Sequence, residues 1–284
     1  MCRLIAYQGP SVRLEDIVIR PSHSLIVQSQ VAEEAKLAVN GDGFGLAWYA
    51  NHNRFRGDIT ESSCGTGEGA AQAALYKEIM PAWANPNLLN LCRAIHAPSF
   101  ITHVRASTFG GATYQNCHPF THGSWSFAHN GQIGGFEKLR RPLENLLPDH
   151  LFRQRLGITD SELLFLLIMS LGLDEDQPDH PSVACERAIR LIENLRTDHQ
   201  CRQPLRLTFV MSNGKVTNGC RYSSDGNAPT LYLSKPDCCT GRILASEPLD
   251  GDHCNWRMVS EGEFVEISAD RVTIRELNYF PALR

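Results

Sequence analysis

The chain has 284 residues, of which 42% are hydrophobic and 20% charged, a composition typical of globular proteins and unlike disordered or fibrous chains. The formal net charge of −4 gives no cationic field that would attract nucleic acid or anionic lipid. No apolar run reaches the ~18 residues of a membrane span, and the N-terminal segment lacks the core of a signal peptide. We therefore expect one cytoplasmic domain over residues 1–284 that binds neither nucleic acid nor membrane.

Ten cysteines occur at irregular spacing without an export signal, so reduced thiols are favoured over a disulfide framework. No CxxC pair is present. The combination of Cys238-Cys239 with His253-Cys254 is a poor zinc pattern, because adjacent ligands rarely reach one tetrahedral ion together. A P-loop is also missing from the sequence. We expect no metal and no cofactor.

In the first half of the chain, strand-compatible residues predict a β-strand over residues 2–7 with Cys2 at its start. A glycine-rich segment follows at residues 40–45 and leads into a second strand around residues 46–48. Residues 68–80 are predicted as a helix that ends at Pro81. Two further strands are expected within SFITHVRAST (residues 99–108) and SWSFAHNGQI (residues 124–133), each ending in small or polar residues suited to a pocket.

In the second half, TDSE at residues 159–162 predicts a capping box with Thr159 as N-cap and Glu162 three residues on, followed by a buried helix. Apolar residues at helical spacing predict another helix after Pro181. Strands return at residues 205–211, 230–234, 242–246, 263–268 and 271–277, with a turn at residues 212–214. Strands, then helices, then strands favour a layered α+β fold.

Cys2 is a candidate nucleophile, because removal of Met1 would leave a free α-amine beside its thiol. An α-amine has a reference pKa near ~8 and a thiol near ~8.5, so the two are matched for proton exchange at neutral pH. No separate histidine base is then needed. From position alone, the alternative is that Cys2 is an inert residue of a buried strand.

Seven blocks occur in order along the chain: MCRLIAY, NGDGFGLAWY, THVRAST, NCHPF, FAHNGQI, TDSE and ASEPL. Together they resemble the signature blocks of the class II glutamine amidotransferases. The resemblance extends from Cys2 to about Ile267. It implies the four-layer αββα sandwich of the N-terminal-nucleophile hydrolases and a cysteine amidohydrolase that cleaves the γ-amide of glutamine or of a γ-glutamyl compound through a thioester on Cys2.

Attack on an amide creates an oxyanion that needs hydrogen-bond donors. The resemblance assigns this catalytic role to Asn130 and Gly131, which taken alone could equally be a hairpin turn. It assigns Arg105 to the α-carboxylate of the substrate, for which a planar bidentate cation is suited. Thr108 is implied as a further substrate contact. Asp160 is implied as the acceptor of the α-ammonium, although an acidic residue in the first turn of a helix is also favoured by the helix dipole.

The neighbouring polar residues are given structural roles. Cys117 and His118 are adjacent on an extended segment and should point to opposite faces. His103, His118 and His129 lack the partners of a metal site, and we expect them to orient backbone near the pocket. Ser246-Glu247 is expected to support the site from behind.

The chain departs from large synthase-type members at Ala106 and Phe109, where tryptophan and histidine are common. Its length and the blocks HVRAST and ASEPL look more like the stand-alone branch, which includes the γ-glutamyl amidohydrolase of ergothioneine biosynthesis and the amidotransferase-like subunit of glutathione degradation. We expect a small γ-glutamyl substrate, with any synthase or peptidase partner being a separate protein. The alternative is a catalytically silent, glutamyl-binding regulatory subunit of a partner enzyme.

Overall fold

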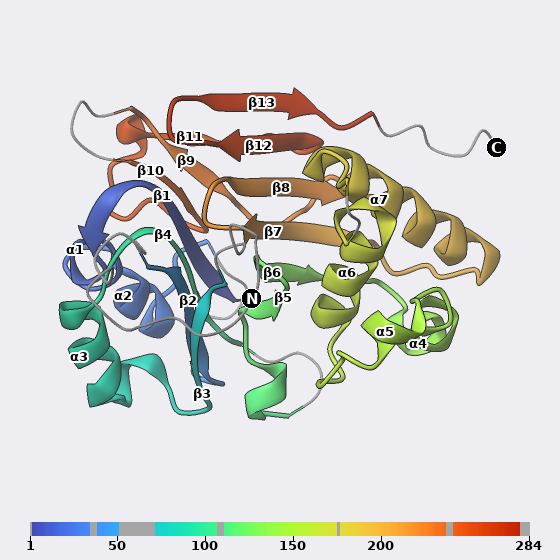
Figure 1. The fold of residues 1–284 in the computed structure, drawn as a ribbon, viewed down its shortest axis with the longest axis horizontal. Helices are drawn as coiled ribbons and strands as arrows, with labels where there is room; N and C mark the ends of the chain where they lie inside the picture. Colours follow the sequence, from blue (N-terminus) through green and yellow to red (C-terminus); the bar gives the residue numbers. More distant parts are fainter. Residues whose placement is uncertain are drawn as a thin grey trace, which may run out of the picture.

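The computed structural model describes residues 2–34, 39–50, 72–106, 111–174, 177–236 and 241–278. Two antiparallel β-sheets lie face to face, and helices cover the outer face of each (Figure 1). The helices of residues 15–94 pack on one sheet, and those of residues 136–198 pack on the other. This order of layers confirms the expected α+β fold, a four-layer αββα sandwich.

The first sheet has seven strands in the order β11-β9-β10-β1-β4-β2-β3. Their bounds are β1 Arg3–Arg13, β2 Phe44–Tyr49, β3 Ala74–Glu78, β4 His96–Val104, β9 Tyr232–Ser234, β10 Arg242–Ala245 and β11 Trp256–Met258. The strands β1 and β4 pair antiparallel with Arg3 opposite Val104. The start of β1 and the end of β4 therefore lie at the same edge of this sheet.

The second sheet has six strands in the order β13-β12-β8-β7-β6-β5. Their bounds are β5 Phe120–His122, β6 Trp125–Gln132, β7 Arg206–Ser212, β8 Thr217–Ser223, β12 Glu263–Ile267 and β13 Val272–Glu276. The strand β6 pairs antiparallel with β7 along its whole length, which places Asn130 opposite Thr208.

The α-helices are α1 Glu15–Val18, α2 Leu25–Gln30, α3 Pro86–Ala94, α4 Phe136–Glu144, α5 Asp149–Phe152, α6 Asp160–Ile168 and α7 Pro181–Asp198. Shorter helical turns are η2 Ala82–Ala84, η3 Tyr114–Asn116, η4 Met169–Leu173 and η5 His253–Asn255. As expected, α7 begins with Pro181, whose missing N–H is not needed in the first turn. In the part of the chain that the structure describes, no helix combines the length and apolar character needed to cross a membrane.

Three apolar cores separate the four layers. The layer between the sheets is built from small and branched side chains, including Leu4, Ile101 and Ala128. The outer cores lie under the helices, and in one of them the rings of Phe127 on β6 and Phe165 on α6 stack with centroids 5.1 Å apart. Burial of these apolar faces is the main force that holds the layers together.

The predicted helix over residues 68–80 is wrong where the structure describes it. Residues 51–71 lie outside the described ranges, and the next ordered element is the strand β3, paired antiparallel with β2 from Trp48–Ala74 to Phe44–Glu78. Helix propensity is a weak prior that tertiary pairing overrides. Here the backbone groups of β2 need partners on the side away from β4, and β3 provides them.

The predicted cap of α6 is half right. The Thr159 side chain accepts a hydrogen bond from the backbone N–H of Glu162 at 3.2 Å. The Glu162 carboxylate, however, accepts from the backbone nitrogens of Leu156 at 3.0 Å and Gly157 at 2.7 Å instead of returning to Thr159. It thereby ties the preceding loop to the helix.

Sequence patterning missed strand β8, because glycine and asparagine interrupt its apolar residues. The structure explains the glycine. A Cβ on Gly219 would lie 2.7 Å from a methyl carbon of Leu244 in the opposite sheet, so the two sheets approach closely at this point.

Candidate active site

Strand alternation directs Cys2 and Arg105 into the space between the sheets. Leu4 and Ile101 belong to the core between the sheets. Successive side chains alternate between the two faces of a strand, so Cys2, two residues before Leu4, points the same way as Leu4. Arg105, four residues after Ile101, shares that face. Since the start of β1 and the end of β4 coincide, the two side chains lie at one edge.

The same reasoning brings Asn130 to this edge from the other sheet. Ala128 on β6 belongs to the core between the sheets, and Asn130 follows it by two residues on the same face. His103, two residues before Arg105, lies within electrostatic range of His129. The ends of β4 and β6 are therefore neighbours across the gap between the sheets.

The thiol of Cys2 contacts the backbone that follows Arg105. Its Sγ accepts a hydrogen bond from the Ala106 N–H at 3.4 Å and lies 3.5 Å from the Ala106 carbonyl oxygen. The residue is half-buried. Burial raises the pKa of the Cys2 thiol, and the bond from Ala106 offsets only part of this effect. The resting side chain is therefore a neutral thiol at pH 7.

Arg105 is held by backbone pairing as well as by its side chain. Its N–H donates to the Gly43 carbonyl at 2.8 Å, and its carbonyl accepts from the Asp42 N–H at 2.9 Å. The guanidinium Nη1 donates to the Gly111 carbonyl at 3.0 Å, and the residue is 3% exposed. These two backbone bonds join the segment around Arg105 to the glycine-rich segment of residues 40–45. Thr108 lies outside the described residues.

Asn130 and Gly131 stand at the end of β6 with an unused donor. Asn130 is 1% exposed, and its Nδ2 has no hydrogen-bond partner within the described ranges. A buried amide donor without an acceptor is unfavourable by itself, so this donor is available to a ligand. Gly131 must be glycine here, because a Cβ would lie 2.1 Å from the Arg206 carbonyl oxygen.

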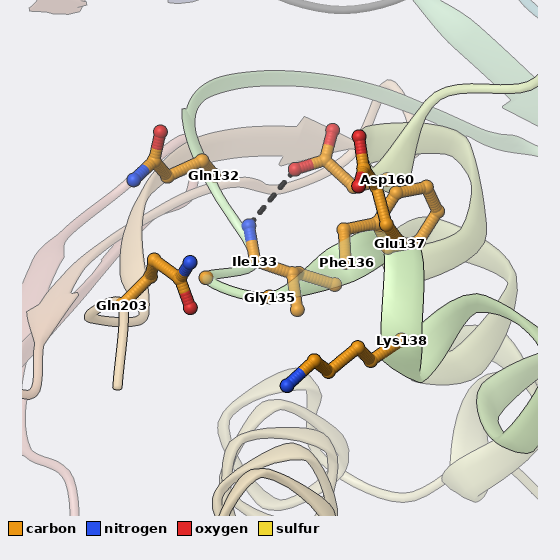
Figure 2. A pocket seen from close by; sticks show the side chains of 9 residues that line it. Gln132, Ile133, Gly135, Phe136, Glu137, Lys138, Asp160 and Gln203 are labelled. Carbon is orange, nitrogen blue, oxygen red and sulfur yellow. Dashed lines mark hydrogen bonds between the residues drawn. The ribbon is translucent and has the colours of Figure 1, made fainter. Parts of the chain in front are cut away.

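Asp160, the first residue of α6, reaches back to the end of β6. Its Oδ2 accepts a hydrogen bond from the Ile133 N–H at 2.8 Å (Figure 2). The next residue, Ser161, bonds through its Oγ to Nδ1 of His129 at 2.9 Å. Asp160 therefore lies beside the segment that follows Asn130 and Gly131 as well as at a helix N-terminus, where its charge is also favoured by the helix dipole.

A cavity of about 350 Å³ opens next to Asp160. Figure 2 shows Gln132, Gln203 and Lys138 around it, with the Asp160 carboxylate turned toward Ile133 at its wall. Among the described residues, its lining includes Asp160 but neither Cys2 nor Arg105. The structure thus brings Cys2 and Arg105 together between the sheets, while Asp160 lines this cavity and bonds to the segment that follows Asn130.

Three histidines form a buried cluster behind the site. The rings of His103 and His118 have centroids 4.2 Å apart. Burial lowers the pKa of His103 to about 3 and the pKa of His118 well below its usual value. Burial also lowers the pKa of His129, while the Asp160 carboxylate acts in the opposite direction. All three are neutral at pH 7. Within the described ranges, no group of three or more His, Cys, Asp or Glu side chains could hold a metal ion.

The strand that carries Cys2 is anchored by residues that sequence patterning did not assign. Arg3 is fully buried, and its Nη1 donates to the Glu247 carboxylate at 2.7 Å. Glu247 is also 2.6 Å from Nε2 of His23. Ser246 accepts a hydrogen bond from the Leu4 N–H through its Oγ at 3.0 Å. In the sequence, only the block ASEPL indicated that Ser246 and Glu247 support the start of β1. No sequence pattern indicated a role for Arg3 or His23.

Asn116 was also missed, although it lies in the block NCHPF. Its Nδ2 donates to the Gly111 carbonyl, which also accepts from Arg105, and its Oδ1 accepts from the Ile158 N–H at 3.1 Å. A Cβ on Gly157 would lie 2.7 Å from that Oδ1. Asn116 therefore connects the segment that holds Arg105 to the loop that leads into α6 and Asp160.

Comparison with known proteins agrees with this geometry. The family model for class-II glutamine amidotransferases matches residues 15–221. The probable glutamine amidotransferase DUG3 of Saccharomyces cerevisiae is 31% identical over 96% of this chain and 77% of its own length. The gamma-glutamyl-hercynylcysteine sulfoxide hydrolase of Mycolicibacterium smegmatis is 25% identical over 98% of this chain and 100% of its own length.

Among solved structures, a glutamine aminotransferase class-II domain protein from Silicibacter pomeroyi superposes with a TM-score of 0.70 and 30% identity, covering 98% of this chain and 100% of that one. The layer order and the place of Cys2 before a central strand are those of the N-terminal-nucleophile hydrolases. Within that class, the chain belongs to the class II glutamine amidotransferases. The expected enzyme class, an amidohydrolase of γ-glutamyl amides, is confirmed by this membership.

Proposed function

We propose that the protein hydrolyses the γ-amide bond of glutamine or of a γ-glutamyl peptide through a γ-glutamyl thioester on Cys2. The observation that carries this proposal is the buried Asn130 amide, whose Nδ2 donor has no acceptor among the described residues and lies at the edge of the sheets near Cys2. A preformed donor without an acceptor in the resting enzyme suits an oxyanion that exists only during the reaction. Gly131 would supply a backbone N–H as the second donor.

Removal of Met1 would place the α-amine on the same residue as the thiol. Because burial raises the pKa of the thiol, the thiol needs a base at the moment of attack, and the amine takes its proton. Sulfur then bonds to the amide carbon, and the amine returns the proton to the departing nitrogen. Water cleaves the thioester, which releases glutamate and restores the thiol.

The glutamyl end would be held by two opposite charges and one hydroxyl. Arg105 suits the α-carboxylate, because a guanidinium offers two parallel donors. Asp160 suits the α-ammonium. Its carboxylate already accepts one backbone N–H at 2.8 Å, which fixes its orientation and leaves other lone pairs for a ligand. Thr108 is proposed as a further contact from its family match.

The relatives narrow the substrate to two types. One carries the name of a glutamine amidotransferase and another that of a γ-glutamyl hydrolase. Arg105 and Asp160, which we call the glutamyl clamp, would hold the glutamyl end of either substrate.

The test of the nucleophile is Cys2→Ala, with Cys254→Ala as the control because Cys254 is an exposed thiol. Hydrolysis of glutamine and of γ-glutamyl-alanine should be lost in the first variant and kept in the second, with chelator present. Turnover by Cys2→Ala would refute the mechanism. If wild-type protein also shows no turnover but binds glutamate, the regulatory alternative is correct. Intact-mass measurement on protein from its native host checks that Met1 is removed.

The clamp has its own test. An N-acetylated substrate lacks the ammonium and would leave the half-buried Asp160 without its ligand. We expect N-acetyl-glutamine to react roughly 10- to 100-fold more slowly than glutamine, on the order of the ~1.5–3 kcal/mol of a hydrogen bond to a charged group. Equal rates would remove Asp160 from the clamp.

A further inference from the structure

A second cavity, of about 200 Å³, lies between the edge strand β3, the turn η3 and the helix α6. Its floor is apolar and buried and includes Phe120, Phe165 and Leu166, while Tyr114 and Leu156 form an exposed rim. Pockets for drug-sized ligands usually measure roughly 300–1,000 Å³. This cavity therefore suits a smaller ligand, about the size of one amino acid.

Lys77 on β3 brings a positive charge into this cavity. The residue is half-buried, and its Nζ lies 4.9 Å from the ring centroid of Phe120 and 5.8 Å from that of Tyr114. Over the described ranges, this ammonium has no hydrogen bond and no carboxylate partner within ion-pair distance. Aromatic faces compensate only part of the lost hydration of a cation, so an anion in the cavity would be stabilised.

The carboxylate on the cavity wall does not neutralise Lys77. Glu162 is buried, and its two oxygens accept hydrogen bonds from the Leu156 and Gly157 backbone nitrogens. That arrangement holds the loop before α6 and directs both Glu162 oxygens to backbone donors. The Glu162 charge still acts on Lys77 and favours its ammonium form, but within the described ranges no ion pair joins the two side chains. The cavity therefore combines apolar walls with a lysine that makes no ion pair among the described residues.

We propose that this cavity binds a small organic carboxylate with an apolar body, with Lys77 as the counter-ion of the carboxylate. Two sources share this chemistry. One is the carboxylate of an amino acid that leaves from a γ-glutamyl peptide, and this source rests on the proposed function. The other is a free carboxylate that is neither substrate nor product. Cys117 lies within electrostatic range of both Lys77 and Cys2, so the cavity and the candidate nucleophile have a common neighbour.

Binding should weaken in alkaline solution. Burial lowers the pKa of Lys77 to about 8, with Cys117 and Glu162 acting in the opposite direction. The other titratable groups facing it are His118, which is neutral, and the Tyr114 phenol. As pH rises through 8, the ammonium loses its proton. We expect the affinity for a carboxylate to fall roughly tenfold or more between pH 7 and pH 9.5.

The experiment uses 3-phenylpropionate as the probe, titrated calorimetrically into the full-length protein, with 3-phenylpropanol as the uncharged comparison. Lys77→Met keeps the length of the side chain and should weaken probe binding at least tenfold, whereas Lys77→Arg should retain it within threefold. Arg105→Gln controls for binding at the glutamyl clamp and should leave the affinity unchanged. Equal affinity in wild type and Lys77→Met, or no saturable binding by wild type, overturns the proposal. Loss of binding in Arg105→Gln alone also overturns it.

Crystals soaked with 3-(4-bromophenyl)propionate give a second measurement that does not depend on how a variant folds. The bromine anomalous peak should lie in the cavity beside Phe165. A peak only between the sheets next to Arg105 would overturn the proposal.

Inhibition kinetics then distinguish the two sources of the carboxylate, the leaving amino acid and a separate free carboxylate. If the leaving amino acid occupies the cavity, the probe should compete with γ-glutamyl-phenylalanine but not with glutamine, and Lys77→Met should raise KM for the dipeptide alone. If a separate carboxylate occupies it, inhibition should have the same pattern for both substrates. Absence of any amide hydrolysis would contradict the proposed function. The calorimetric result would still decide whether the cavity binds a carboxylate.

Discussion

Arg3 and Glu247 form a buried ion pair, 2.7 Å between Nη1 and Oε1, that joins the residue after Cys2 to the segment following β10. Glu247 also accepts from the backbone N–H of Glu34 at 2.9 Å. Burial alone would raise the pKa of Glu247, but the His23 bond, the backbone donors and the Arg3 charge hold it below its usual value. The pair therefore remains charged at neutral pH and fixes the start of β1.

Glu247→Gln should destabilise the protein by about 3–5 kcal/mol, because a buried guanidinium would lose its counter-charge. The free energy of unfolding in urea measures this loss. Asp225→Asn is the matched control, since its partner Arg206 is less buried, and it should cost about 1 kcal/mol or less. Similar losses of unfolding free energy in the two variants would show that burial does not strengthen the contribution of the Arg3–Glu247 pair to stability.

Arg105→Lys should raise KM for glutamine by roughly 10- to 100-fold, because a point-charge ammonium cannot reproduce two parallel hydrogen bonds to a carboxylate. The effect on kcat should be smaller. Arg93→Lys provides the comparison, since Arg93 pairs with Glu15 on the surface and should leave KM unchanged. Steady-state kinetics with an unaltered KM in Arg105→Lys would place the substrate carboxylate elsewhere.

Asn130→Ala should lower kcat by about 10²- to 10³-fold, the loss typical for one oxyanion donor. KM should change little, because the donor is used only in the transition state. Stability should stay within about 1 kcal/mol of wild type, since the Nδ2 atom makes no hydrogen bond among the described residues. A variant with normal kcat would exclude Asn130 from catalysis.

Acid should destabilise the protein through the buried histidines. The pKa of His103 is lowered by burial to about 3, so between pH 6.5 and pH 3 the unfolded chain binds a proton that the folded chain does not. Stability from this residue is fully present above pH 6.5 and falls by about 1.4 kcal/mol for each pH unit below it. His103→Gln removes this contribution, so its stability difference from wild type should shrink by about that amount from pH 6 to pH 5. Equal dependence of stability on pH in wild type and His103→Gln would contradict the assignment of this effect to His103.

Local patterning was sufficient for the elements whose side chains alternate or recur cleanly. The strands that carry Cys2, Arg105 and Asn130, the N-cap Thr159 and the start of α7 at Pro181 follow from residue spacing and backbone chemistry alone. The choice of site residues depended on the ordered blocks, because no single residue type distinguishes a nucleophile from a core cysteine.

The tertiary structure decided what depends on partners distant in the chain. Residues 74–78 form a strand because β2 offers them an edge to pair with, which no local propensity encodes. Arg3 meets Glu247, and Asn116 meets the loop before α6, only when separate segments fold together. Likewise, Lys77 lies within the predicted helix of residues 68–80, and the sequence gives it no special role. Its desolvation, and with it the binding site that we propose, arises only when β3, η3 and α6 enclose it.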